Sequence, residues 1–231
     1  MRSMTPKHLA VLAACMVSPQ EPRADTGWTQ DFIVDSGELQ SSGRNPYFIL
    51  EPGYQLVLEH GRERLTITVL DTTERIAGVD TRVVEERETN GDTVVEVSRN
   101  FYAISKRTNS VFYFGEDVDI YRNGVIAGHE GAWRSGLNGA RFGLALPGLP
   151  LLGARYYQEL APRVAMDRGR ILTLNGVLTT PGGRFTSVLR IEESTPLEPG
   201  QREAKLYAPG VGLVQDASLR LVRYGAVGRR E

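Results

Sequence analysis

The sequence predicts an all-β protein, a single antiparallel meander curled into a barrel or half-barrel, with at most short helical turns. Two observations predict this class. Leu65, Ile67 and Val69 alternate with threonines, and an apolar period of two is typical of a half-buried strand. No segment keeps an apolar period of 3.6 residues for three turns, which excludes a protein built on amphipathic helices.

Three long strands are expected in the first half of the chain, at about 79–88, 92–105 and 110–122. Each is rich in residues that favour strands, and turn signals separate them: Asn90-Gly91-Asp92 and Arg107-Thr108-Asn109. Consecutive strands joined by short turns favour antiparallel pairing.

Two further kinds of turn divide the rest of the chain. Asn123-Gly124 predicts a hairpin, because a type I′ turn needs positive φ at both central residues. Proline-glycine pairs also separate neighbouring strands, and they are Pro52-Gly53, Pro181-Gly182, Pro199-Gly200 and Pro209-Gly210. Only Ala161–Gly169 allows a short helical turn, with Pro162 in its first turn.

Composition limits the class of function. The chain has 231 residues, with 27 Lys and Arg against 28 Asp and Glu, a net charge of -1. This balance excludes a basic nucleic-acid-binding protein, so no nucleic-acid partner is expected. One cysteine and three histidines exclude a disulfide scaffold and a cysteine-rich zinc site.

The amino-terminal segment indicates export. Arg2 and Lys7 precede an unbroken apolar run, Leu9–Val17. At 1.5 Å per residue a helix of this length cannot cross a hydrocarbon core of about 30 Å. A short apolar run behind a basic start is typical of an export signal that is later removed.

The run contains the only cysteine of the chain. Leu12-Ala13-Ala14-Cys15 looks like a bacterial lipobox, in which the Cys15 thiol receives a lipid and becomes the new N-terminus. We therefore favour lipidation over plain secretion, and secretion over a protein that is not exported. The expected organisation is a signal peptide at 1–15, a polar, proline-bearing tether at 16–31 and a single β-domain at 32–228. Its expected location is the cell envelope, where it faces the periplasm or the cell surface and contacts the membrane through the lipid.

Three segments together resemble an uncharacterised group of exported bacterial β-rich proteins and lipoproteins. They are Tyr156-Tyr157-Gln158-Glu159-Leu160-Ala161-Pro162, Tyr207-Ala208-Pro209-Gly210-Val211-Gly212-Leu213-Val214 and Phe112–Asp119. The second segment also looks like an element of lipoprotein-carrier-like half-barrels. The resemblance covers roughly residues 65–225. It implies a location and a fold type, but no activity and no catalytic residue.

An acidic segment offers a candidate metal site made of Asp117, Asp119, Asn123 and Glu130. Counted from Asp119, the positions match a twelve-residue calcium loop except the third, where Tyr121 replaces an oxygen ligand. The flanking residues indicate strands, whereas an EF-hand requires helices. We therefore favour a hairpin with solvated acidic residues and expect no cofactor, with calcium as the alternative.

The most apolar stretch of the domain is Leu144–Ala154, which two prolines and two glycines bar from regular helix or central strand. A loop that closes the barrel end is the simpler interpretation. The alternative is an exposed apolar surface that contacts a lipid or a partner. On that hypothesis Leu146, Leu149, Leu151 and Trp133 contact the ligand or partner.

The function favoured by these observations is non-catalytic: an envelope β-protein that binds a hydrophobic or envelope ligand, or a protein partner. The chain has no Gly-x-Ser-x-Gly element, phosphate-binding loop or His-Glu-x-x-His zinc motif. The alternative is a hydrolase, possibly with a bound divalent cation, that uses paired carboxylates. Its candidate residues are Glu116, Asp117, Glu130, Glu159 and Asp167. A purely structural protein, with a filled core, is the third hypothesis.

Overall fold

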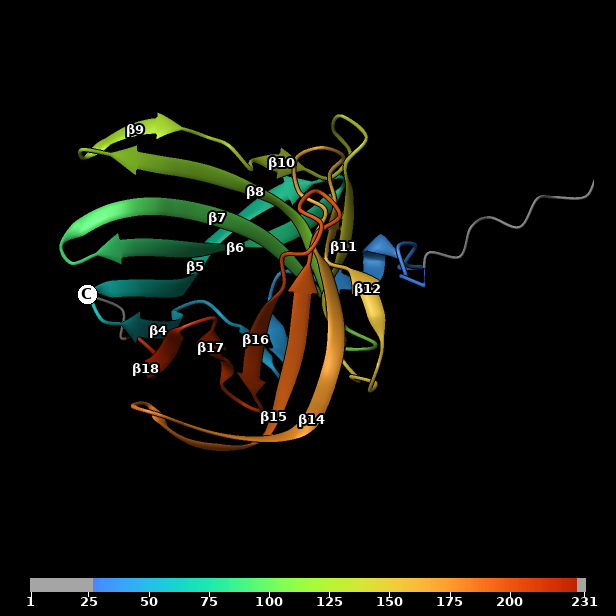
Figure 1. Ribbon diagram of the computed structural model, residues 1–231. Helices are drawn as coiled ribbons and strands as arrows, with labels where there is room; N and C mark the ends of the chain where they lie inside the picture. The colour runs from blue at the N-terminus through green and yellow to red at the C-terminus, as the bar shows by residue number, and fades with distance from the viewer. Residues whose placement is uncertain (1–26, 228–231) are drawn as a thin grey trace, which may run out of the picture.

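The computed structural model describes residues 27–227, and almost all of the regular secondary structure in this range is antiparallel strand (Figure 1). A single 3-10 turn, η1 (Ser36–Glu38), precedes the strands. The strands are β1 (Leu39–Gln40), β2 (Gly43–Asn45), β3 (Phe48–Leu50), β4 (Tyr54–His60), β5 (Glu63–Ile76), β6 (Val79–Asn90), β7 (Thr93–Ser105), β8 (Val111–Arg122), β9 (Val125–Gly128), β10 (Trp133–Arg134), β11 (Arg141–Leu146), β12 (Arg155–Tyr157), β13 (Glu159–Leu160), β14 (Arg168–Thr180), β15 (Gly183–Ser194), β16 (Glu203–Ala208), β17 (Gly212–Asp216) and β18 (Leu219–Ala226).

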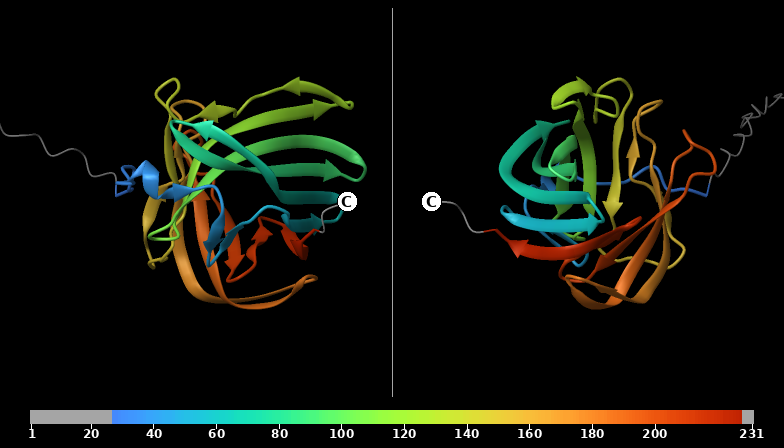
Figure 2. Two further views of the ribbon diagram at one scale, coloured as in Figure 1. Left: turned by 180° about the vertical axis from the view of Figure 1, so that it is seen from behind. Right: turned by 60° about the vertical axis from the view of Figure 1, so that its left-hand side comes forward.

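Thirteen of the strands form one antiparallel sheet that wraps round a common interior, as the two further views show (Figure 2). β1, β9 and β10 pair with strands of this sheet, and β2 and β3 form a separate two-stranded sheet. The order in the sheet is β12-β14-β15-β16-β17-β18-β4-β5-β6-β7-β8-β11-β13. Neighbours follow one another along the chain from β4 to β8 and from β14 to β18, and β18 pairs with β4. The order skips strands at β8–β11, β11–β13 and β12–β14. The predicted all-β meander curled into a barrel is confirmed.

One short segment nearly closes the barrel. The two strands at the ends of the sheet, β12 and β13, are consecutive in the chain and are separated only by Gln158. β12 pairs with β14, whereas β13 pairs with β11. The approach is so tight that a Cβ on Gly143 of β11 would collide with the Gln158 carbonyl group, so a residue without a side chain stands there. The side chains next to Gln158 therefore lie where the two ends of the sheet meet, which is the seam of the barrel.

The turns lie where the sequence predicts them. Asn123 and Gly124 have φ of 53° and 78° and connect the paired residues Arg122 and Val125, as a type I′ hairpin requires. The turn at Gly91-Asp92 joins β6 to β7, and each of the four proline-glycine pairs lies between two strands. The short helical turn that the sequence allows within Ala161–Gly169 does not form a helix: Ala161 forms a bridge with Ala165, and β14 begins at Arg168.

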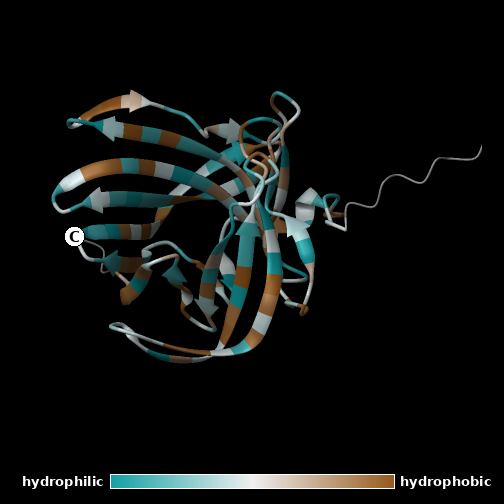
Figure 3. Cartoon of the chain, in the orientation of Figure 1, coloured by the Kyte–Doolittle hydropathy of each residue, from teal (hydrophilic) through white to brown (hydrophobic). Residues whose placement is uncertain are grey.

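The sheet buries apolar residues on both faces. The larger cluster fills part of the barrel interior and includes Leu58, Val84, Ile104, Leu189 and Ile191. A second cluster lies on the outer face of β5–β8, where Val83, Phe101, Ala103, Phe112 and Phe114 pack against Phe32 and Leu39 of the amino-terminal segment. The alternation of hydropathy along the long strands is visible in Figure 3. The inner face of the sheet lines the barrel interior, and the segment before β2 covers the outer face of β5–β8.

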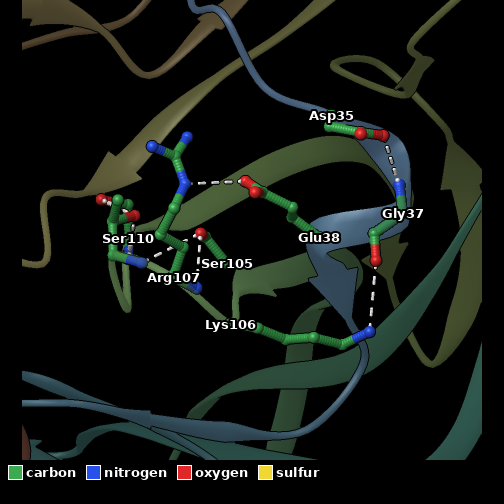
Figure 4. Close-up of polar contacts among 8 residues, drawn as sticks. Asp35, Gly37, Glu38, Ser105, Lys106, Arg107 and Ser110 are labelled. Carbon is green, nitrogen blue, oxygen red and sulfur yellow. Dashed lines mark hydrogen bonds and ion pairs between the residues drawn. The ribbon is translucent and has the colours of Figure 1, made fainter.

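Side-chain contacts fix that amino-terminal segment to the turn between β7 and β8 (Figure 4). The Lys106 ammonium donates to the Gly37 carbonyl oxygen at 3.2 Å, and Arg107 pairs with Glu38 at 3.0 Å. Asp35 accepts the Gly37 N–H at 2.9 Å and caps the 3-10 turn. These bonds hold the covering segment against the outer face.

The last part of the expected tether also contacts the barrel. Thr29 bridges Tyr156, and Asp31 pairs with Arg141 at 2.7 Å. The Arg168 guanidinium lies 4.5 Å from the centre of the Trp28 ring, within the range of a cation–π contact. The expected signal peptide, Cys15 and the rest of the tether fall outside the described residues. Between residues 27 and 227, no helix has the length and apolar character needed to cross a membrane.

Candidate functional site

The barrel encloses a cavity of about 250 Å³. Part of its lining is apolar and belongs to the interior cluster, and the residues include Leu56, Ile67, Val69, Val84, Leu146 and Leu213. The other part is polar and carries ionisable side chains: Glu86, Glu116, Glu159, Asp167, Glu193, Lys205 and Asp216. Tyr102, Tyr113 and Tyr207 also line the cavity. The interior is therefore amphipathic and is not completely filled by side chains.

The period of two along the strands positions the acidic groups. On β6 the buried Val84 is followed two residues later by Glu86, and on β15 Ile191 is followed by Glu193. Both pairs keep to the inner face, because successive side chains of a strand point to opposite faces. The apolar lining thus changes to an acidic lining along the same strands.

A bulge brings Glu116 to the interior. Tyr113 of β8 lines the cavity and Phe114 packs on the outer face. The register of β7 and β8 then shifts, and Gly115 has φ of 152°. An extra residue in one strand changes which later residues face inward. As a result Glu116 lines the cavity, while Asp117 pairs with Arg134 at 2.8 Å on the other side of the wall.

Lys205 is the only lysine in the cavity lining, and no arginine lies there. Its ammonium group is 3.0 Å from Glu193 and 3.9 Å from Asp216. The Glu193 carboxylate also accepts a hydrogen bond from the Gln158 amide at 2.9 Å. The Glu193 carboxylate raises the pKa of Lys205 well above its ordinary value, so the lysine is charged and its partners are occupied.

Glu159 and Asp167 form a second acidic group at the seam of the barrel. Glu159 is 4% exposed and accepts the Asp167 backbone N–H at 2.8 Å. Burial, and then the Asp167 carboxylate, raise the pKa of Glu159 well above its ordinary value. Burial beside Asp167 therefore favours the protonated form of Glu159.

Glu86 and Glu116 have pKa values near neutrality. Burial raises the pKa of Glu86 to about 7, and the Asp216, Glu88 and Glu193 carboxylates contribute further. Burial also raises the pKa of Glu116 to about 7, with contributions from Glu86 and Glu96. Both groups change charge within the physiological range, which ordinary glutamates do not.

Several polar groups of residues that line the cavity have no hydrogen-bond partner among the described residues, and they include the Glu86 carboxylate, the Tyr207 hydroxyl and the Trp133 Nε1–H. The Glu86 carboxylate and the Tyr207 hydroxyl form no hydrogen bond or close ion pair with any residue between 27 and 227. Tyr207 is only 8% exposed. Buried polar groups in proteins usually have a partner, so these two groups are free to bind a molecule in the cavity.

The structure brings together three of the five carboxylates proposed for the alternative hydrolase. Glu116, Glu159 and Asp167 all line the cavity. Asp117 lies on the outer face, and Glu130 is exposed after β9. Three of the five candidate carboxylates therefore share one cavity, and the remaining cavity acids come from β6, β15 and β17.

The candidate metal ligands do not come together. Asp117 pairs with Arg134, while Asp119 contacts Arg99 and His129 at 3.2 and 3.1 Å. Asn123 occupies the hairpin turn and Glu130 is exposed. In the part of the chain that the structure describes, no three His, Cys, Asp or Glu side chains are grouped as a metal ion requires. The acidic segment is a hairpin, as the favoured interpretation predicts.

The four residues proposed for apolar contact divide into two pairs. Leu146 and Trp133 are 2% and 6% exposed and line the cavity. Leu149 and Leu151 are 77% and 61% exposed and lie in the loop between β11 and β12. The first pair is placed to touch a molecule in the cavity, and the second faces solvent together with Leu152.

Sequence reasoning missed Glu86, Glu193, Lys205 and Asp216. A signal for two of them is present: Glu86 continues the inner-face spacing of Val84, and Glu193 that of Leu189 and Ile191. The signal is weak, because acidic residues at strand ends are usually solvated. Asp216 also follows a register shift between β16 and β17, which alternation alone does not predict.

Comparison of the chain with protein-family models, with curated proteins and with solved structures finds no significant match. The functional argument therefore depends on the geometry and chemistry of the cavity.

Proposed function

We propose that the protein binds a small amphipathic molecule in the barrel cavity and does not transform it. The observation that carries this proposal is the divided lining: apolar side chains from β4, β5 and β11, and ionisable side chains from β6, β8 and β15–β17, face one cavity. Binding sites for small molecules are typically concave and mostly apolar, with a few polar groups that fix orientation. An amphipathic molecule satisfies both parts.

The acidic lining supports a functional role for the interior. Burying carboxylates near one another costs stability, because each must be desolvated or protonated. Replacing Glu86 and Glu116 by apolar residues would make the barrel more stable, because the removal of buried ionisable groups often increases stability. A purely structural protein has no reason to keep a cavity lined in this way. We infer that the acidic groups serve a ligand.

A carboxylate-dependent hydrolase is the second candidate, and the pKa of Glu116 favours it. A carboxyl group with a pKa of about 7 is suited to act as a general acid near neutral pH. Glu159 and Asp167 supply further carboxyl groups in the same cavity. The distinguishing observation is the fate of the bound molecule, which a binding protein returns unchanged.

Export and lipid anchoring at Cys15 are part of the proposal. They are supported by the basic start, the apolar run and the lipobox-like Leu12–Cys15 segment. A binding protein held at the envelope by its lipid is the function that these features and the cavity support together.

The test is recovery of the bound molecule. We expect native mass spectrometry of protein purified from its own cells to show a small-molecule adduct that denaturation releases. Ala145 is a small residue of the lining, so A145F fills the cavity and is expected to abolish the adduct. A127F is the matched control, because Ala127 is exposed on β9. An adduct that A145F retains contradicts the proposal, and a molecule hydrolysed on incubation favours the second candidate.

A further inference from the structure

We propose that the molecule bound in the cavity is an organic cation, in which an amine or ammonium group is carried on an apolar chain. This inference rests on the proposed function, because it assigns the head group of the same ligand. It is carried by the charge of the lining, by the aromatic rings near the acidic groups and by the polar groups that have no partner.

The charge of the lining is strongly one-sided. Six carboxyl groups and a single lysine face the cavity. Lys205 lies against Glu193 and Asp216, so two of the carboxylates already have a cationic partner. Glu86, Glu116, Glu159 and Asp167 form no close ion pair with a cation of the lining, although the charge of Lys205 acts to lower the pKa of Glu86 and of Asp167. A ligand with one positive charge is attracted by this excess, and an anionic ligand is repelled.

Aromatic rings lie beside the unbalanced acids. Tyr102 and Tyr113 stack with their ring centres 4.8 Å apart, and Phe48 packs against Tyr102 at 5.0 Å. Trp133 meets Tyr113 edge-on at 5.2 Å. Tyr113 and Trp133 neighbour Glu116 directly, because Trp133 is its cross-strand partner. Aromatic faces with carboxylates are the surroundings in which proteins bind amines and quaternary ammonium groups.

Two of the groups that have no partner in the described part of the chain, Glu86 and Tyr207, supply acceptor atoms, whereas the third, the buried Trp133 Nε1–H, can only donate. Glu86 forms no hydrogen bond with the described residues, and neither does the hydroxyl of Tyr207, which is nine-tenths buried. Both line the cavity. An ammonium group that donates to the Glu86 carboxylate and to the Tyr207 oxygen satisfies both.

The electrostatics of the empty cavity agree with this assignment. Burial and repulsion among the carboxyl groups raise the pKa of Glu86, Glu116 and Glu159. Ionisation of these groups is therefore less favourable than in water when no cation is bound. A bound organic cation stabilises the ionised forms, so its binding releases protons.

The lining also specifies the other end of the ligand. Leu56, Ile67, Val69 and Leu213 offer no hydrogen-bonding side chains. They favour a hydrocarbon chain over a polyamine or a sugar, because burying apolar surface is favourable and an unpaired polar group there is costly. The ligand class is thus a single cation with one apolar chain.

The experiment compares three probes that share one chain and differ only in the charge of the head group: octylammonium, octanol and octanoate. Their affinities for the full-length protein are measured by calorimetry at pH 7.5 and low salt. We expect octylammonium to bind at least about tenfold more tightly than octanol, and octanoate most weakly, as a charge pair of ordinary strength implies. In buffers of different ionisation enthalpy, octylammonium binding is expected to release protons.

Two double variants locate the charge effect. E86Q/E116Q removes two unbalanced acids and is expected to reduce the preference for octylammonium to about that of octanol. Its retained octanol binding shows that the cavity is still folded. E85Q/D117N is the matched control, because Glu85 pairs with Arg99 and Asp117 with Arg134, away from the cavity. The control is expected to keep the wild-type preference.

The outcomes separate the two proposals. Equal affinity for octylammonium and octanol overturns the cationic assignment and leaves the amphipathic-ligand function standing. Tightest binding of octanoate also overturns it and identifies Lys205 as the anchoring group. If none of the probes binds and A145F changes no adduct, the proposed function itself fails. A preference that E85Q/D117N removes as fully as E86Q/E116Q also overturns the assignment to the cavity acids.

Discussion

Glu116 and Asp117 are neighbours in the chain but lie on opposite sides of the barrel wall. Glu116 lines the cavity, and Asp117 pairs with Arg134 at 2.8 Å. The Arg134 guanidinium in turn lies 4.0 Å from the centre of the Phe101 ring, which belongs to the outer cluster. The bulge at Gly115 causes this arrangement, since it lets Tyr113 and Glu116 share the inner face despite their odd spacing.

The first prediction concerns that glycine. Gly115 has φ of +152°, and an added Cβ would lie 2.6 Å from the Trp133 carbonyl oxygen. G115A therefore combines an unfavourable backbone conformation with a backbone clash. We expect it to lower the free energy of unfolding by about 2–4 kcal/mol, measured by urea denaturation.

A second glycine separates the two causes. Gly124 also has positive φ, but an added Cβ would meet nothing within 4 Å. G124A is expected to cost only about 1 kcal/mol, which is the typical effect of a left-handed position. Equal losses in the two variants would show that the contact with Trp133 does not constrain the bulge.

Much of the fold could be predicted from local sequence. Asn123-Gly124 and the proline-glycine pairs set the turns, because few residues tolerate their backbone angles. The strand alternation then gives the inner and outer faces. The closure could not be predicted, because it depends on a three-dimensional approach of β11 to Gln158. No local pattern shows that β12 and β13 pair with different neighbours.

The candidate site was predicted only in part for the same reason. The sequence offers Glu116, Glu159 and Asp167 as candidate paired carboxylates, and they do face one cavity. Asp117 and Glu130 are candidates of the same kind but lie elsewhere. The direction of a strand residue depends on register, and a single bulge reverses it. Acidic composition therefore identifies candidates, whereas register selects among them.

The second prediction follows from the pKa values of Glu86 and Glu116, both about 7. In the unfolded chain a glutamate titrates near 4.3. The folded protein thus binds these protons more tightly, so stability falls as pH rises from about 4.5 to 7 and stays low above it. E86Q/E116Q mimics the protonated forms. We expect it to raise the melting temperature at pH 8 by several degrees and to match wild type near pH 4.5.

The direction in which E86Q/E116Q changes the melting temperature at pH 8 tests this prediction. Substituting a stabilising carboxylate lowers the melting temperature at high pH, whereas removing two repelling groups raises it. E85Q/D117N serves again as the control, and at pH 8 it is expected to lower stability slightly because it removes exposed ion pairs. A lower melting temperature of E86Q/E116Q at pH 8 would contradict the assigned pKa shifts.

The third prediction separates the buried and exposed leucines around the loop between β11 and β12. Leu146 is 2% exposed, so L146A is expected to cost about 2–5 kcal/mol in the free energy of unfolding. Leu149 and Leu151 are largely exposed, so L149S/L151S is expected to change stability by less than about 0.5 kcal/mol. Urea denaturation measures both. A large loss in the double variant would show that the loop packs on the barrel.

The fourth prediction tests the anchor. If Cys15 carries the lipid, C15A abolishes incorporation of labelled palmitate and moves the protein from the membrane fraction to the soluble fraction. No other cysteine is present to replace it. Plain secretion instead gives a processed, unlabelled protein before any substitution. Labelling that persists in C15A excludes lipidation at this residue.

The last prediction concerns the lysine inside the cavity. Lys205 is 3.0 Å from Glu193, and both side chains are largely buried, at 30% and 15% exposed. K205M removes the cation and leaves Glu193 and Asp216 without a partner, which is expected to cost about 1–3 kcal/mol at pH 7.5. K205M/E193Q removes one of the orphaned charges and is expected to recover part of this loss. The coupling energy from the double-mutant cycle, measured by urea denaturation, isolates the pair. Strict additivity of the two substitutions would show that Lys205 and Glu193 do not stabilise each other. Lys205 could then bind an anionic ligand, which the occupied ion pair otherwise prevents.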